Sequence, residues 1–256
     1  MNFVDTHAHL YLPEFDNDRD EMIARAIEAG VLKILLPNID IKSAGALVSL
    51  SSEYPGIIYP MMGLHPTSVK DDYPEQLDII EEWLRKDNFI AVGEIGIDLY
   101  WDRTFIREQV EAFRRQVALA VELNLPVVIH SRESFEEIFD LLENFKGEGL
   151  KGVFHSFTGN IDQAEKATAM GFYLGIGGIV TFKNSGLDSV ISSIGISRLI
   201  LETDSPYLAP SPYRGKRNES AYIINSAKRI SEVTGKTLDE VASVTTANAN
   251  ELFNLS

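Results

Sequence analysis

The sequence predicts an α/β fold consisting of a single (β/α)8 barrel of the TIM type. Short apolar runs rich in Val, Ile, Leu and Phe alternate with longer segments of helical periodicity, as expected for buried parallel strands covered by crossover helices. The chain has 256 residues, which is close to the usual length of one such barrel. No Ser/Gly-rich linker or change of composition divides it. We therefore expect residues 1–256 to form one domain.

Eight short apolar runs are the candidates for the strands. They are residues 2–6, 32–36, 57–62, 90–95, 127–129, 152–154, 172–176 and 199–201. A doubly wound open sheet is the alternative arrangement, and it normally carries a Gly-rich nucleotide-binding loop after its first strand. The sequence HAHL occupies that place here, so the barrel is preferred.

Segments with helical periodicity lie between the strand candidates. In residues 107–123, for example, Val110, Phe113 and Val117 recur at spacings of three and four and define one apolar face. The other predicted helices are residues 18–29, 74–86, 134–144, 161–170, 220–233 and 238–252. Strands that alternate with helices in this way form the parallel sheet of a barrel.

The composition excludes several classes of protein. The absence of cysteine rules out a disulfide scaffold, a thiolate metal site and a cysteine nucleophile, so any metal must have nitrogen and oxygen ligands. The net charge of −15 argues against a broad electrostatic grip on nucleic acid or on an anionic membrane. No apolar run approaches the roughly 18 residues of a membrane span, and MNFVDTHAHL does not resemble a secretory signal. We expect a cytoplasmic protein without a membrane partner.

All five histidines follow or end a predicted strand. They are His7, His9, His65, His130 and His155. Any one of them alone would be read as an ordinary core or surface residue, but this reading fails for the set. In a barrel the carboxyl ends of the strands form the active face, so the five imidazoles are expected to meet there.

The residue types near these strand ends are those of a metal site. His7 and His9 are two residues apart, which points both side chains to the same face of a strand. Glu94 is expected to end the fourth strand, and Glu202 and Asp204 follow the eighth with the same spacing of two. A charge so close to a buried strand needs a partner to offset its desolvation. A salt bridge or a helix cap is the alternative for each acid, and for Glu202 it is as acceptable as a functional role.

The motifs HAH, GLHP, GEIGID, VIHSR, FHSF, ETDSP and RGKRN occur in this order between residues 5 and 218. Together they resemble the TatD family of metal-dependent deoxyribonucleases, which are barrel hydrolases of the amidohydrolase type. The resemblance implies two divalent metal ions at the carboxyl ends of the strands. Their implied ligands are His7, His9 and Asp204 for one ion, His130 and His155 for the other, and Glu94 as the bridge between them.

The resemblance also implies the residues around the substrate. His65, Arg132 and Arg214 match family positions there. Where the family commonly has Glu followed by Pro after RGKRN, this chain has Glu219 and Ser220, a departure expected to affect entry into the next helix rather than the chemistry.

The activity that the resemblance implies is hydrolysis of phosphodiester bonds in DNA. A metal centre at the bottom of a barrel mouth admits a strand terminus more easily than a duplex, so we expect an exonuclease that acts on single strands or ends. Six protein ligands leave coordination positions open for water and substrate, as in catalytic metal sites. A metal-activated water is the expected nucleophile, with Asp204 and Glu94 as catalytic residues and Asp204 orienting or deprotonating the water. The ions are Mg²⁺, Mn²⁺ or Zn²⁺, with the choice left open. No obligate protein partner is expected.

Basic and aromatic residues supply candidate contacts to DNA. Arg132 can bind a phosphate through its planar fork, the alternative being a salt bridge to a neighbouring acid. Arg214, Lys216 and Arg217 concentrate positive charge in one loop of an acidic chain, the alternative being a solvated surface.

Two weaker candidates lie at other strand ends. Tyr100 and Trp101 offer a surface for base stacking, whereas Trp83 is expected in the core. Gly175 to Gly178 form either an anion-binding nest or, more simply, a turn.

Two other functions compete with the nuclease. The same ligands could hydrolyse an amide, an ester or a D-aminoacyl-tRNA, because a metal hydroxide attacks a carbonyl carbon as readily as phosphorus. A non-catalytic nucleic-acid-binding protein or scaffold would have no use for all six ligands. The DNase is therefore the leading interpretation, with the amide or ester hydrolase second.

Overall fold

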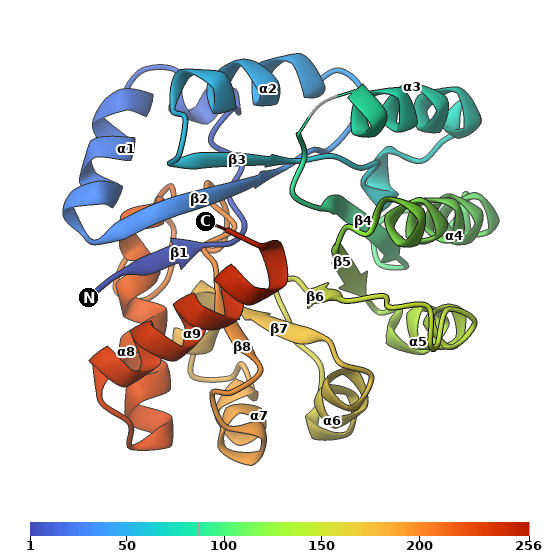
Figure 1. The fold of residues 1–256 in the computed structure, drawn as a ribbon. Helices are drawn as coiled ribbons and strands as arrows, with labels where there is room; N and C mark the ends of the chain where they lie inside the picture. Colours follow the sequence, from blue (N-terminus) through green and yellow to red (C-terminus); the bar gives the residue numbers. More distant parts are fainter. Residues whose placement is uncertain (87, 256) are drawn as a thin grey trace.

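Parallel strands surrounded by helices form a barrel-like ring in the computed structural model, which describes residues 1–86 and 88–255 (Figure 1). The strands are β1 (Phe3–Asp5), β2 (Val31–Pro37), β3 (Ile58–Met61), β4 (Val92–Asp98), β5 (Val127–Arg132), β6 (Gly152–Phe154), β7 (Tyr173–Ile176) and β8 (Leu199–Leu201). The helices are α1 (Arg19–Glu28), α2 (Ala44–Glu53), α3 (Tyr73–Lys86), α4 (Ile106–Leu123), α5 (Phe135–Glu143), α6 (Ile161–Ala169), α7 (Leu187–Ile194), α8 (Ile223–Thr234) and α9 (Leu238–Phe253). No helix in these described ranges is long and apolar enough to cross a membrane.

The strands form two parallel ladders that meet at two seams. One ladder has the order β1-β2-β3 and the other β4-β5-β6-β7-β8. At the first seam, Met62 pairs with Val92 through an isolated bridge. At the second, the backbone N–H of Thr6 donates to the carbonyl of Leu201 at 3.1 Å, next to a bridge between Ala8 and Ser205. The ring is thus consistent with the predicted TIM barrel, with ladder pairing reduced to short contacts at the seams.

The end of the barrel away from the histidines is filled by apolar side chains. Val4, Leu35, Val128 and Ile200 come from four different strands and pack into one buried cluster, to which the last turn of α9 adds Phe253. Helix α9 lies across this end of the ring in Figure 1. Each such side chain contributes about 1.5–3 kcal/mol by leaving water, so this end serves stability and the opposite end is left for chemistry.

All eight predicted strands are present, but three of them extend further than predicted, β2 by one residue at each end and β4 and β5 by three residues at their carboxyl ends. Strand β4 continues to Asp98 and β5 to Arg132. Glu94 therefore lies inside β4 and does not end it, which corrects the sequence prediction. The strand continues because the ladder between β4 and β5 continues, with Asp98 opposite Arg132.

The helix prediction omits α2 and α7, and it starts one helix too early. A 3-10 turn over Ser220–Tyr222 precedes α8, which begins at Ile223. This turn contains Ser220, where the sequence departs from the family pattern, so the expectation that the departure concerns helix entry agrees with the structure.

Candidate metal centre and active site

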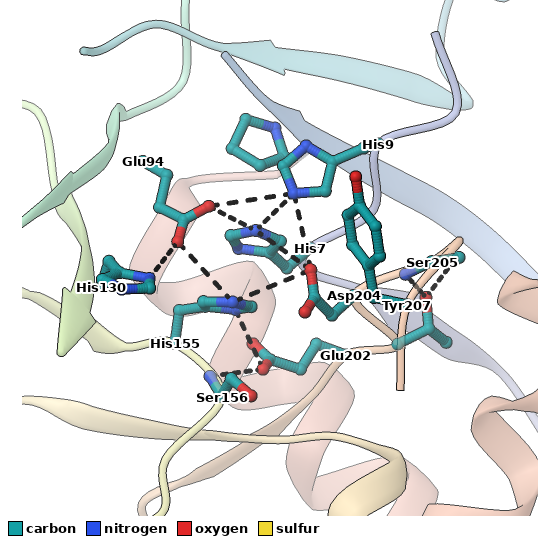
Figure 2. A network of polar contacts seen from close by, with 12 residues as sticks. His7, His9, Glu94, His130, His155, Ser156, Glu202, Asp204, Ser205 and Tyr207 are labelled. Atoms are coloured by element: carbon teal, nitrogen blue, oxygen red, sulfur yellow. Dashed lines mark hydrogen bonds and ion pairs between the residues drawn. The ribbon is translucent and has the colours of Figure 1, made fainter. Parts of the chain in front are cut away.

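The five histidines converge at the carboxyl ends of the strands, and Figure 2 shows four of them, His7, His9, His130 and His155. His7 and His9 follow β1, and although the strand ends at Asp5, both rings point to the barrel mouth with their Nε2 atoms 3.3 Å apart. The ring of His155, which directly follows β6, stacks on that of His7 with centroids 3.4 Å apart. The sequence prediction that these side chains meet is therefore correct in geometry.

The two carboxylate oxygens of Glu94 face different histidines. Oε2 lies 3.0 Å from Nε2 of His7 and 3.8 Å from Nε2 of His9. Oε1 lies 2.9 Å from Nδ1 of His130, 3.3 Å from Nε2 of His65 and 3.8 Å from Nε2 of His155. This buried carboxylate thus lies between two sets of imidazoles.

Asp204 closes the group on the side of β8. Its Oδ1 lies 3.5 Å from Nε2 of His9 and 3.9 Å from Nε2 of both His7 and His155. The residue has φ +57°, a left-handed conformation that Asp tolerates better than most residues. With 15% of its side chain exposed, Asp204 is the carboxylate of the group that solvent reaches most easily.

Outer hydrogen bonds fix which nitrogen of His9 faces the centre. The Tyr11 hydroxyl donates to the carbonyl of Pro37 at 2.8 Å and lies 3.0 Å from Nδ1 of His9. Since its one proton is used on Pro37, the hydroxyl accepts from Nδ1–H of His9, a tautomer assigned from this network. Nε2 of His9 then presents a lone pair to the centre, as a metal ligand must.

His65 has the opposite arrangement. Its Nδ1 accepts from the backbone N–H of Thr67 at 3.2 Å, so Nε2 carries the proton and donates toward Glu94. A histidine that donates from Nε2 is suited to hold a carboxylate or an oxygen of a substrate. The sequence assigned His65 to the substrate, and this tautomer agrees with that role better than with a ligand role.

Two further carboxylates hold His130 and His155 from outside. Oδ2 of Asp98 lies 2.9 Å from Nε2 of His130, and Oε1 of Glu202 lies 3.0 Å from Nδ1 of His155. Glu202 also accepts from the backbone N–H of Ser156 at 2.6 Å. Of the two alternatives left open for Glu202, the structure therefore favours a place in the site.

Burial and neighbouring charges set the ionisation of these groups. Burial, reinforced by the nearby charge of His155, lowers the pKa of His7 to about 4. Burial would raise the pKa of Glu94, but the surrounding imidazoles outweigh it and hold the pKa well below its usual value. The same competition lowers the pKa of Asp204.

Burial would lower the pKa of His155, but the charges of Glu202 and Glu94 outweigh it and raise this pKa to about 10. Asp98 and Glu94 likewise outweigh burial and raise the pKa of His130. Metals bind ionised carboxylates and neutral imidazoles, so His130 and His155 lose a proton when a metal binds.

The donor set fits divalent cations. Three groups have ligand atoms that all lie within 4.8 Å of one another: His7, His9 and Glu94; His7, His155 and Asp204; His65, Glu94 and His130. Ligands on opposite sides of a zinc-sized ion are separated by about 4 Å, twice the usual metal–ligand distance. Together these groups contain the six predicted ligands and also His65, which was assigned to the substrate. None of the three groups contains both His130 and His155, which the resemblance assigns to one ion.

The predicted substrate residues lie around this centre with different freedom. Arg132 is exposed and stacks on Tyr100, its guanidinium carbon 4.2 Å from the ring centroid, and within residues 1–86 and 88–255 it has no carboxylate partner. The salt bridge considered as its alternative is therefore not formed with any of these residues. Arg214 is exposed and lies over the ring of Phe182 at 4.3 Å.

The basic loop offers less positive charge than the sequence suggested. Arg217 is bound by both carboxylate oxygens of Asp18, at 2.6 and 2.7 Å, so its charge is already neutralised.

Near the same strand ends, a Cβ added to Gly175 would lie 2.3 Å from Oε2 of Glu202. This glycine leaves room for a carboxylate, which argues against the anion-binding nest and for a packing role.

Sequence reasoning missed three outer partners of the site histidines, namely Asp98, Tyr11 and Thr67. Asp98 lies four residues after Glu94 in the motif GEIGID, and alternation along β4 places both on one face, so this signal was available. Tyr11 gave no such signal, because a tyrosine two residues after a histidine is compatible with any loop.

The family model described as TatD related DNase matches residues 4–254 of the chain. The chain belongs to this family. It is 40% identical to YabD of Bacillus subtilis, an uncharacterised metal-dependent hydrolase, over 98% of this chain and 99% of that protein. It is 31% identical to a protein of Erwinia tasmaniensis named 3'-5' ssDNA/RNA exonuclease TatD, again over 98% and 99% of the two chains. The crystal structure of the TatD homologue YjjV of Escherichia coli K12 superposes with a TM-score of 0.93 at 29% identity, covering 99% of this chain and 98% of the other.

Membership of the TatD family confirms the resemblance, the α/β fold of parallel strands and the enzyme class predicted from the sequence. The protein is a metal-dependent hydrolase, of the class that acts on ester bonds. The convergence of nitrogen and oxygen donors at the barrel mouth agrees with that class.

Proposed function

We propose that this TatD-family hydrolase is a nuclease that cleaves phosphodiester bonds in single-stranded DNA or at DNA ends, with two divalent ions in its active site. His7, His9 and Asp204 would hold one ion, His130 and His155 the other, and Glu94 would bridge them. The name of the Erwinia tasmaniensis relative, an exonuclease of single-stranded DNA and RNA, supports the substrate class. Whether RNA is also cleaved is decided by the assay below.

One observation carries the two-ion proposal. Glu94 directs Oε2 at His7 and His9. Its Oε1 faces the proposed ligands His130 and His155 and also His65. A carboxylate with two differently occupied oxygens is what a bridge between two ions requires. Buried at 3% exposure, Glu94 would be a costly charge unless cations or imidazolium groups balanced it.

Different side chains would have different roles in the hydrolysis. When bound, the ions would lower the pKa of water and offset negative charge on the phosphate. Asp204 is ionised and partly reached by solvent, so an oxygen of its carboxylate can accept the proton of the attacking water. His65 can donate from Nε2 to an oxygen, and Arg132 can take a phosphate oxygen through its fork.

The test is a nuclease assay on single strands labelled at the 5′ or the 3′ end, with Mg²⁺, Mn²⁺ or Zn²⁺ added. We expect stepwise shortening from one end, and the label that is lost first gives the polarity. RNA strands, esters, lactones and D-aminoacyl-tRNA are assayed in parallel. Faster turnover of the carbonyl substrates would replace the nuclease by the alternative hydrolase.

His155→Ala is the control for this assay. Removing one of the proposed ligands should lower kcat by at least about 100-fold, within the range lost when a group that stabilises transition-state charge is removed. The circular dichroism spectrum should remain that of the parent. A folded, metal-loaded parent that leaves every nucleic acid intact would refute the proposal.

A further inference from the structure

We propose that Tyr100, Trp101 and Arg132 form a nucleotide subsite beside the metal centre, where one unpaired base stacks on Trp101, and Arg132, which stacks on Tyr100, binds an adjoining phosphate. This inference rests on the proposed nuclease function and specifies which residues bind the DNA strand. Four observations carry it: exposure of the rings, their anchoring, the cavity next to Trp101 and the unpaired charge of Arg132.

The two rings are exposed where burial would be the norm. Trp101 has 68% and Tyr100 51% of its surface exposed, and the rings meet edge to face with centroids 4.9 Å apart. A single exposed hydrophobic residue needs no explanation. The planes of the two rings are 86° apart, so Tyr100 contacts Trp101 edge to face, and the exposed indole is the surface on which a base can stack.

A buried carboxylate fixes these rings relative to the metal centre. Oδ1 of Asp98 accepts from the backbone N–H groups of Tyr100 at 2.9 Å and Trp101 at 3.1 Å. Its other oxygen, Oδ2, contacts His130, which in turn contacts Glu94. The loop that carries the rings is therefore tied through one side chain to a proposed metal ligand, and a base stacked there has a defined position relative to the reacting phosphate.

A cavity of about 370 Å³ adjoins Trp101. Its lining consists of Thr67, Lys70, Asp98, Trp101, Asp102 and Gln109. Thr67 and Asp98 are the residues that hold His65 and His130, so the inner wall of the cavity is also the outer wall of the metal centre. An aromatic face combined with hydrogen-bonding groups and a volume of a few hundred Å³ is typical of a pocket for a small planar group.

Arg132 adds a cation that the protein leaves available. Its guanidinium stacks on Tyr100 at 4.2 Å and lies 5.4 Å from the centroid of Trp101. Stacking orients the fork without consuming its hydrogen-bond donors, which no carboxylate of the described residues occupies. A phosphate next to the stacked base is the natural acceptor, since Arg binds phosphate in two-pronged fashion.

This arrangement selects single strands. A base can lie flat on Trp101 only when its face is free of its own neighbours, and in a duplex every base face is covered by stacking. The chain carries a net charge of −15, so a nucleic acid must be held by local contacts. Stacking supplies binding energy that does not depend on overall charge.

Tryptophan fluorescence tests binding directly. The chain has two tryptophans, so Trp83→Phe leaves Trp101 as the sole reporter. The probes are a thymidine tetranucleotide with hydrolysis-resistant phosphorothioate linkages and an abasic tetramer of the same charge. We expect the thymidine tetramer to quench Trp101 at lower concentration than the abasic one by about 5- to 150-fold, the range for loss of one stacked base. Equal quenching by both probes would overturn the subsite.

Kinetics give the second test. Trp101→Ala should raise the KM for a thymidine strand by about 5- to 150-fold with kcat little changed, because stacking binds substrate and transition state alike. Trp101→Phe should retain most of the parent KM, and neither change should affect an abasic strand. If the parent cleaves DNA and Trp101→Ala behaves as the parent, the subsite is wrong and the nuclease stands. Base-dependent quenching in a protein that cleaves no DNA would refute the nuclease and leave a nucleotide-binding site.

Discussion

Four histidines of the centre are each held by an outer partner on the nitrogen that faces away from Glu94 and Asp204. The pairs are His9 with Tyr11, His65 with Thr67, His130 with Asp98 and His155 with Glu202. Such contacts fix the ring orientation and the tautomer before a cation arrives. Among the described residues, Nδ1 of His155 and Nδ1 of His7 both lack a hydrogen bond. The Nδ1 atom of His155 still has its ion-pair contact with Glu202, whereas no carboxylate of the described residues lies at this nitrogen of His7. Its ring is held instead by stacking on His155.

Replacing Glu202 tests how much one outer partner contributes. Glu202→Gln keeps the shape but removes the negative charge 3.0 Å from Nδ1 of His155. We expect metal affinity to fall by about 10- to 100-fold, as is usual for such outer contacts. Isothermal titration with Zn²⁺ or Mn²⁺ measures this. Glu133→Gln is the matched control, since Glu133 is exposed and, among the described residues, its side chain pairs with Arg103 alone. An affinity equal to that of the control variant would show that Glu202 does not position His155.

Strand β7 leaves space for a carboxylate of the centre, because it has a glycine at the position that faces this carboxylate. Gly175 faces Glu202, and an added Cβ would overlap its carboxylate at 2.3 Å. The carboxylate has little room to withdraw, because it is also fixed by the N–H of Ser156 and by His155. Packing between elements thus decides this position, where a pattern of glycines in the sequence indicated only a turn or a nest.

Gly175→Ala should therefore destabilise the protein and weaken metal binding together. Overpacking a buried site typically costs about 1–3 kcal/mol, which urea unfolding of the metal-free protein resolves. Gly177→Ala is the matched control two residues on, because its Cβ would find its nearest neighbour at an ordinary 3.6 Å. Equal stability of the two variants would mean that Glu202 moves aside without cost.

The elements that the sequence predicts well are those whose signal is local. Buried strands rich in Val, Ile and Leu can be recognised from their composition alone, and all eight were predicted. Helix α2 was missed because GALVSLSS mixes Gly, Val and Ser, which have weak helix propensity, and α7 is a short run of the same kind. Both helices depend on packing against the sheet. Glu94 and Asp204 were found by residue type, whereas the role of Glu202 became visible only through His155.

At the scale of the whole molecule, ion pairs join the two ends of the chain beside the barrel mouth. Asp18 precedes α1, and Arg217 lies in the loop after β8, which also carries Glu219. Arg25 binds both Asp18 and Glu219. The four side chains form a network across the seam where β8 meets β1, and this seam has few ladder hydrogen bonds of its own. We infer that the network compensates for the weak pairing there.

Acid should break the ion pairs of this network in a defined range of pH. The Arg217 guanidinium, followed by Arg25, lowers the pKa of Asp18 from 3.8 to about 2. A depressed pKa of an acid stabilises the fold above its unfolded value, so the contribution is complete above about pH 4 and is lost as the pH falls toward 2. Because Asp18 is about one-third exposed, with 32% of its side chain reached by solvent, screening leaves roughly 1 kcal/mol of this effect.

Asp18→Asn should therefore lower the free energy of unfolding by about 1 kcal/mol at pH 7, and the difference from the parent should shrink between pH 4 and pH 2. Urea unfolding at several values of pH measures this difference. Arg217→Gln should cause a similar loss, and the double variant should lose less than the sum of the two, because both changes remove the same contact. Additive losses, or a difference that does not depend on pH, would show that the seam is held by packing alone. The ion pairs would then be surface features without a structural role, as many exposed pairs are.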